Sequence, residues 1–224
     1  MIKVAVCLSG CGFLDGAEIH ESVLTLLALD QAGAKVVCCA PDQPQLTVTN
    51  HLTREQAAEQ RNTLVESARI ARGNIVDISQ IRAEEIDGLV FPGGFGAALN
   101  LCTFGRDGVE CQVNPEVERL VGQMLDVGKP IGAICIAPAL LARLVGKRDL
   151  HPRLTIGTDR TTAKALQQMG ARHQDCACES FVVDEELRIV STPAYMLGTG
   201  PAQVFEGIRR LVTEVLRMAS VKQG

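Results

Sequence analysis

One cysteine of this sequence lies where a nucleophile would be expected. Residues 130–134 form an apolar run typical of a short buried strand, and Cys135 follows directly, ahead of a segment of helical composition. At such a junction, free backbone N–H groups and the positive end of the helix dipole favour the thiolate over the thiol. The position therefore predicts a nucleophilic Cys135 with a lowered pKa. The alternative is a small buried apolar side chain, the usual fate of cysteine.

Two glycine-rich segments also follow predicted strands. Residues 91–96 read FPGGFG, and their N–H groups could approach a ligand closely and stabilise an oxyanion. They match neither the phosphate loop GxxxxGK(S/T) nor the dinucleotide motif GxGxxG. Residues 9–21 read SGCGFLDGAEIHE and lead into a helix, with Glu18 and Glu21 as candidate carboxylates. Each segment keeps a structural alternative, because glycine clusters often form simple turns and glutamates of a first turn complement the helix dipole.

The surrounding elements alternate short apolar runs with longer amphipathic ones, without repeats or a linker. We expect strands at residues 4–8, 35–40, 88–91, 130–134 and 153–156, an antiparallel pair at 181–183 and 188–191, and helices at 18–31, 115–126, 136–145, 161–169 and 202–218. Residues 46–49 resemble a strand and 54–72 have helical composition, so residues 42–79 are expected to form an insertion beside the core.

This order predicts one α/β domain over residues 1–224, with a mostly parallel sheet covered on both faces. Ligands of such sheets bind outside the carboxyl ends of the strands. The predicted sites at Cys135 and at the two glycine-rich segments all follow such ends.

Composition restricts the function further. The 224 residues carry 22 basic and 26 acidic side chains, a net charge of −4, and 3% aromatic residues without Trp, which argues against nucleic-acid binding. The uncharged run at residues 130–142 contains two prolines and is too short to cross a membrane, and no signal segment is visible, so we expect a cytoplasmic protein. Nine cysteines predict reduced thiols rather than a disulfide framework. The group His173, Cys176 and Cys178 lacks a fourth ligand, so no metal is predicted.

Taken together, these segments resemble the ElbB family, named for enhanced lycopene or isoprenoid biosynthesis, within the PfpI-type class I glutamine amidotransferase-like superfamily. The motifs that carry the resemblance are SGCGFLDGAEIHE at 9–21, ESARIARG at 66–73, FPGGFGAA at 91–98 with Asn100 and Leu101, and CIAP at 135–138. The resemblance implies a flavodoxin-like three-layer sandwich, a homodimer, a nucleophile elbow at Cys135 and Glu21 as the acid that reaches it. It also implies glyoxalase or deglycase activity on small reactive aldehydes and an association with isoprenoid biosynthesis.

The sequence departs from the superfamily at its histidines. The amidotransferase triad places His-Pro-Glu where this chain has STPAY at residues 191–195, and PfpI-type hydrolases often place a histidine where this chain has Ile136. We therefore expect Cys135 to add to an aldehyde such as glyoxal, with the oxyanion bound by the N–H groups of Gly94 and Ile136. Glu21 would then move the protons that convert the hemithioacetal to a thioester, without a cofactor.

Two other functions stay open. An elbow cysteine beside an acid also suits a redox-sensing or regulatory protein, in which Cys11 could resolve an oxidised Cys135. A cysteine amidase or peptidase would need a histidine near the sulfur. His20 is the first candidate, because it neighbours Glu21 in the sequence.

Overall fold

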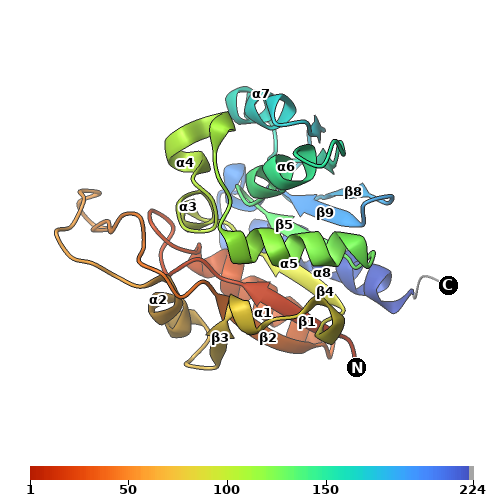
Figure 1. The fold of residues 1–224 in the computed structure, drawn as a ribbon, viewed down its shortest axis with the longest axis horizontal. Helices are drawn as coiled ribbons and strands as arrows, with labels where there is room; N and C mark the ends of the chain where they lie inside the picture. Colours follow the sequence, from red (N-terminus) through yellow and green to blue (C-terminus); the bar gives the residue numbers. More distant parts are fainter. Residues whose placement is uncertain (222–224) are drawn as a thin grey trace.

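The computed structural model describes residues 1–221 of the chain and contains a central seven-stranded sheet (Figure 1). Its strands are β1 (Lys3–Cys7), β2 (Lys35–Ala40), β3 (Ile75–Asp77), β4 (Gly88–Phe91), β5 (Ile131–Ile134), β8 (Val182–Asp184) and β9 (Ile189–Thr192). Their order in the sheet is β3-β2-β1-β4-β5-β9-β8, and every neighbouring pair is parallel except β8 and β9. The predicted α/β class with a mostly parallel sheet is confirmed.

Helices cover both faces of the sheet and complete a three-layer sandwich. Helices α1 (Ile19–Gln31) and α8 (Pro201–Ser220) pack together on one face, and α5 (Pro115–Asp126) and α6 (Pro138–Gly146) cover the other (Figure 1). Along β1 the side chains alternate between the layers: Val4 and Val6 pack with α1 and α8, whereas Ala5 and Cys7 pack with α5 and α6. Because both faces are buried, the strands are apolar throughout.

The smaller elements connect these layers. They are α2 (Thr63–Ile70), α3 (Phe95–Leu99), α4 (Phe104–Asp107), α7 (Arg160–Gln168), β6 (Arg153–Leu154) and β7 (Arg172–His173), with single turns of 3-10 helix at η1 (Ile78–Gln80), η2 (Ala83–Glu85), η3 (Gly108–Glu110) and η4 (Ala194–Met196). Within residues 1–221, no helix is both long enough and apolar enough to cross a membrane.

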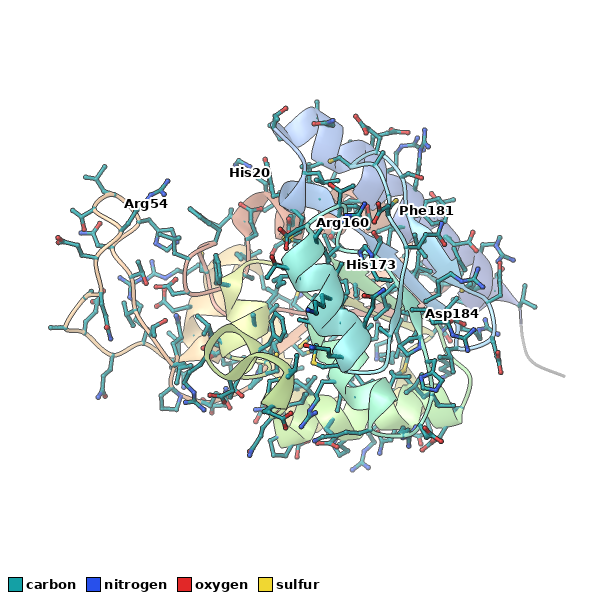
Figure 2. The ribbon with its side chains drawn as sticks, turned by 90° about the horizontal axis from the view of Figure 1, so that it is seen from above. His20, Arg54, Arg160, His173, Phe181 and Asp184 are labelled. Atoms are coloured by element: carbon teal, nitrogen blue, oxygen red, sulfur yellow. The ribbon has the colours of Figure 1, made fainter. Side chains whose placement is uncertain are left out.

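The insertion expected at residues 42–79 is smaller in the structure. Strand β3 is the edge strand of the main sheet, paired with β2, and α2 packs against both. The excursion that remains leaves the sandwich on one side, with Arg54 near its tip (Figure 2). The helix expected over residues 54–72 begins only at Thr63, because the Asn62 side chain caps it by accepting from Val65 N–H.

Two segments predicted as strands lie outside the main sheet. Residues 46–49 form no strand of the sheet, only an isolated bridge from Thr49 to Gln56. Residues 153–156 contribute the short strand β6, which pairs with β7 in a separate two-stranded sheet. Both segments pair locally, so neither extends the parallel sheet.

Candidate active site

Cys135 occupies a sharp turn between β5 and α6. Its backbone φ is +61°, in the left-handed region that non-glycine residues rarely adopt, and its N–H donates to the Thr192 carbonyl at 2.9 Å. Pro138 begins α6, and no side chain caps the first turn. The turn is therefore a strained elbow of the kind found at functional sites, and the N–H of Ile136 at the start of the helical segment donates to the cysteine sulfur.

Glu21 reaches this elbow from α1 and is fully buried. Its carboxylate accepts from the N–H of Gly93 at 3.0 Å and from the N–H of Tyr195 at 3.1 Å, and it hydrogen-bonds the Cys135 thiol. Glu18 has a different role: it caps α1, and its side chain accepts from the N–H of Glu21 at 2.6 Å. The structure thus brings Glu21 and Cys135 together, and leaves Glu18 at the helix end.

The expectation of a lowered pKa for Cys135 is contradicted. Burial raises the pKa of this thiol well above its usual range, and the Glu21 carboxylate raises it further. The N–H groups of Gly94 and Ile136 donate to the sulfur and oppose the shift without reversing it. The two N–H groups favour the thiolate, but desolvation is the larger effect.

Glu21 shows the same effect of burial. Its pKa is raised to about 8, chiefly by desolvation, although the Tyr195 N–H opposes the rise. Both acids are therefore mostly protonated at neutral pH. Glu21 can accept the proton of Cys135 only in its ionised form, which becomes half of the population as the pH reaches about 8. The site at neutral pH is therefore a thiol beside a protonated carboxyl rather than a resting thiolate.

The glycines of FPGGFG are needed for this close packing. A Cβ on Gly93 would lie 2.4 Å from the Cys135 Cβ and 2.7 Å from Glu21 Oε2. Gly94 has φ of +91°, and a Cβ there would lie 2.4 Å from the Glu18 nitrogen. No larger residue could place these N–H groups against the cysteine and the acid. In the structure the N–H groups of Gly94 and Ile136 donate to the Cys135 sulfur, and their binding of a substrate oxyanion stays a prediction.

Cys135 is 7% exposed, but it opens onto a pocket of about 430 Å³. The lining is mostly apolar, and comprises Phe13, Glu18, Gly94, Phe95, Ala98, Phe104, Gly105, Cys135, Ile136, Thr162, Tyr195 and Met196. None of these residues comes from the excursion at residues 42–62. Cys135 thus borders a cavity of the size that small molecules occupy.

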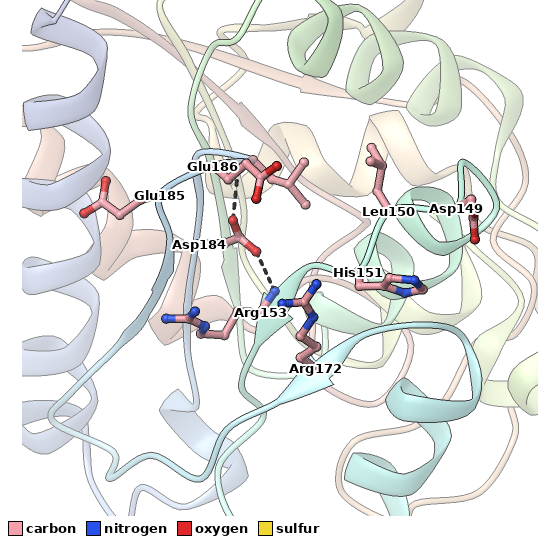
Figure 3. Close-up of a pocket in the computed structure, with 9 residues that line it drawn as sticks. Asp149, Leu150, His151, Arg153, Arg172, Asp184, Glu185 and Glu186 are labelled. Carbon is pink, nitrogen blue, oxygen red and sulfur yellow. Dashed lines mark hydrogen bonds between the residues drawn. The ribbon is translucent and has the colours of Figure 1, made fainter.

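A second pocket, of about 400 Å³, lies at the opposite edge of the sheet (Figure 3). It contains the turn between β8 and β9, where Asp184 accepts from the N–H groups of Arg153 and Leu187. This turn precedes β9, and β9 runs parallel to β5, so the turn marks the amino ends of the parallel strands. Asp184 therefore stabilises the backbone of this turn, and no cysteine lines the pocket.

The histidines all have other partners. The His20 Nδ1 lies 2.7 Å from the Tyr195 hydroxyl. The rings of the other three histidines hydrogen-bond backbone groups: His51 at Thr49, His151 at Gly170 and His173 at Ile156. Within residues 1–221, which include every histidine of the chain, no histidine hydrogen-bonds the Cys135 sulfur. The histidine base of an amidase has no counterpart here.

Tyr195 is a site residue that the sequence analysis did not identify. It belongs to STPAY, the segment that replaces the histidine of the amidotransferase triad, and the structure places that segment beside the elbow. Its backbone N–H orients Glu21, and its ring lines the pocket. Tyr195 could have been found from the sequence, because its segment aligns with the position of the triad histidine.

The structure also locates two other predicted features, Cys11 and the group around His173. Cys11 does not line the Cys135 pocket, and its charged surroundings are Glu66, Arg69, Asp15 and Arg61. His173 lies near Arg160 in Figure 2 and within 3.7 Å of Asp175. In the part of the chain that the structure describes, no group of three metal-ligating side chains forms a metal site.

The sandwich and its elbow cysteine define a class of α/β proteins in which a thiol lies at the carboxyl end of a central strand. The family model described as the DJ-1/PfpI family matches residues 3–193. The chain belongs to the DJ-1/PfpI family.

Several relatives are similar over nearly the whole chain. "Glutamine amidotransferase-like class 1 domain-containing protein 3, mitochondrial" from Homo sapiens is 42% identical, over 96% of this chain and 83% of that protein. "ES1 protein, mitochondrial" from Danio rerio is 34% identical, over 97% of this chain and 86% of that protein. A solved isoprenoid biosynthesis protein with an amidotransferase-like domain from Ehrlichia chaffeensis has a TM-score of 0.89 and 40% identity, over 96% of this chain and 99% of its own. Drosophila melanogaster DJ-1beta, at 18% identity and a TM-score of 0.55 over 97% of this chain and 95% of its own, shares the fold.

Proposed function

We propose that this chain is a cofactor-independent enzyme of the glyoxalase or deglycase type, which converts glyoxal or a similar small reactive aldehyde to a hydroxy acid. One observation carries the proposal: Cys135 lines a pocket without a histidine base, and its thiol hydrogen-bonds the buried Glu21 carboxyl and two backbone N–H groups. The DJ-1/PfpI family includes enzymes, which supports a catalytic role.

In the first step, the sulfur of Cys135 attacks the aldehyde carbon. The Glu21 carboxylate takes the thiol proton as the C–S bond forms, and the loss of its charge removes one cause of the raised pKa of Cys135. The carbonyl electron pair moves to oxygen, where the N–H groups of Gly94 and Ile136 stabilise it. Protonated Glu21 then returns the proton to this oxygen, which completes the hemithioacetal.

In the second step, Glu21 moves a hydrogen between adjacent carbons. Its carboxylate removes the proton from the carbon bonded to sulfur, which gives an enediol as the hydroxyl proton of the hemithioacetal passes to the neighbouring carbonyl oxygen. Protonated Glu21 then returns its proton to the neighbouring carbon, so that the hemithioacetal becomes the thioester of the hydroxy acid. Water then hydrolyses the thioester and restores the Cys135 thiol. Glyoxal and water together have the composition of glycolate, so this reaction needs no external oxidant or reductant.

The test is to follow glycolate formation from glyoxal by the purified protein. We expect Cys135→Ala to abolish turnover and Glu21→Gln to reduce it about 10²–10⁴-fold, the usual contribution of general acid–base catalysis. Cys176→Ala is the matched control, because Cys176 is half-buried and lies outside the pocket. Turnover that survives Cys135→Ala would refute the proposal.

The alternative functions receive less support. A redox sensor needs a readily ionised thiol, but the pKa of Cys135 is raised, and Cys11 does not line its pocket. Selective peroxide modification of Cys135, with aldehyde turnover no faster than that of a free thiol, would favour the sensor. The amidase lacks its histidine, as described above.

The remaining expectations stay proposals. We propose ElbB-type membership and an association with isoprenoid biosynthesis, supported by the motifs and by the similarity to the Ehrlichia chaffeensis protein. A homodimer is proposed from the family resemblance, and sedimentation of the purified chain tests it. A cytoplasmic location is also proposed, and fractionation of cells tests it against the mitochondrial location in the names of the human and zebrafish relatives.

A further inference from the structure

The pocket at Cys135 collects most of the aromatic side chains of this protein. The chain has six Phe, one Tyr and no Trp. Three of those phenylalanines, Phe13, Phe95 and Phe104, and the single tyrosine, Tyr195, line this one cavity. In a chain with so few aromatic residues, this grouping indicates a surface that recognises an apolar ligand.

The phenyl rings come from two segments that the fold holds together at the pocket. Phe95 begins α3, and its N–H donates to the carbonyl of Phe13 in the glycine-rich loop at 2.8 Å. Phe104 begins α4, which packs against α3. Phe13 is 42% exposed and Phe95 is 51% exposed. Large apolar side chains left open to solvent around a cavity mark a binding surface rather than a core.

The cavity is too large for glyoxal alone. Its volume is about 430 Å³, within the range of roughly 300–1,000 Å³ typical of sites for larger ligands, whereas glyoxal consists of two carbons and two oxygens. A molecule of that size bound at the Cys135 sulfur would leave the phenyl rings in contact with water. An apolar substituent on the substrate would displace this water and bury the rings.

The charges of the site restrict the substrate further. Within the described residues, Glu18 is the one charged side chain among those lining the pocket, and Glu21 is buried and does not line it. No basic side chain lines the cavity to pair with a carboxylate or phosphate. The lining therefore disfavours anionic substrates and suits a neutral one.

We infer that the substrate class of this site is a neutral 2-oxoaldehyde that carries an aryl group or an apolar group of similar size. This inference rests on the proposed function and deepens it. The aldehyde carbon bonds to the Cys135 sulfur, and the aryl group contacts Phe13, Phe95 and Phe104. Glu21 moves the hydrogen to the neighbouring ketone carbon while the hemithioacetal hydroxyl proton passes to the ketone oxygen, and hydrolysis of the thioester releases a 2-hydroxy acid. Phenylglyoxal and water together have the composition of mandelate, so the step balances.

The test compares phenylglyoxal with glyoxal as substrates of the full chain, by initial rates of mandelate and glycolate formation. We expect kcat/KM to be at least about 30-fold higher for phenylglyoxal, because each buried apolar group contributes roughly 10-fold or more to discrimination. Phe95→Ala is expected to lower the ratio of kcat/KM for phenylglyoxal to kcat/KM for glyoxal about 10-fold. Phe181→Ala, a phenylalanine outside the pocket, is the matched control.

A second measurement reports on the pocket without turnover. Benzyl alcohol, which carries the aryl group but no aldehyde, is expected to slow alkylation of Cys135 by iodoacetamide in the wild type, and to do so less in Phe95→Ala. Glycolate at the same concentration is expected to give no protection.

The outcomes separate the two proposals. Glyoxal turnover that depends on Cys135, without a preference for phenylglyoxal, overturns the substrate class and leaves the proposed function intact. Absence of Cys135-dependent turnover with both aldehydes overturns the proposed function, and with it the substrate class, even if benzyl alcohol protects the thiol. A preference that Phe95→Ala does not reduce overturns the assignment to these rings.

Discussion

The buried carboxyl of Glu21 predicts an unusual dependence of stability on pH. Its pKa in the folded protein is about 8, against 4.5 for a free glutamate. Between these values the folded state holds a proton that the unfolded state has released. The contribution of Glu21 to stability is therefore fully present below pH 4.5 and is lost as the pH rises through 8.

The size of this loss follows from the pKa shift. One pKa unit corresponds to about 1.4 kcal/mol, so raising the pH through this window costs up to about 5 kcal/mol of unfolding free energy. That is a large part of the 5–15 kcal/mol typical of a domain. The physical reason is desolvation: the ionised carboxylate keeps two backbone N–H donors, and they do not replace its hydration.

The perturbation that tests this reasoning is Glu21→Gln, which removes the charge and keeps the shape. One amide nitrogen then faces a backbone N–H, at Gly93 or Tyr195, and costs about 1–3 kcal/mol independently of pH. The difference in unfolding free energy between wild type and variant should therefore shift in favour of the variant as the pH rises from 5 to 8.

Urea unfolding followed by circular dichroism at several pH values from 5 to 8 measures this difference. Glu118→Gln, an exposed glutamate on α5, serves as the matched control and should track the wild type. A difference between wild type and Glu21→Gln that stays constant within about 0.5 kcal/mol across the range would refute the reasoning, because it would mean that the carboxyl titrates alike in both states.

Three further predictions concern the same site. If Glu21 acts as the base, kcat/KM for glyoxal should rise about tenfold per pH unit below 8 and level off above it, and initial rates that do not change between pH 6 and 9 would contradict this. Gly93→Ala places a Cβ 2.4 Å from the Cys135 Cβ, so it should cost about 1–3 kcal/mol of stability and lower activity about 100-fold. Thermal unfolding and kcat/KM measure the two effects, and wild-type values in both would contradict the prediction by showing that the site can relax. Tyr195→Phe removes the hydroxyl bonded to His20 but keeps the N–H that orients Glu21, so kcat/KM should change less than about 3-fold; a loss near 100-fold would instead make the hydroxyl part of the chemistry.

The main residues that the sequence singled out for the candidate site lie together in the structure. Cys135 and the glycines at residues 93–94 each follow an apolar strand, and parallel strands place their carboxyl ends at one edge of the sheet. Glu21 was selected through the resemblance of the first glycine-rich segment, and the structure places it on the sulfur. These positions depend on local patterns, which the sequence displays directly.

Local patterns were less informative where pairing partners are distant. Residues 75–77 form the edge strand β3 because they pair with β2. Residues 153–154 pair with β7 and so lie outside the main sheet. The short helices α3 and α4 have too few residues to show a helical period, so the sequence did not predict them. Phe95 and Phe104, which these helices carry, were consequently not recognised as part of the site.

The sequence by itself determined the alternation of strands and helices, the elbow cysteine and the absence of a histidine in the triad segment. Only the tertiary structure decided the protonation of the site and the aromatic pocket. The N–H of Tyr195, 174 residues along the chain from Glu21, helps enclose that carboxyl, and the packing raises the pKa of both Glu21 and Cys135. Desolvation depends on which segments cover a group, and that is a property of the folded chain rather than of its local sequence.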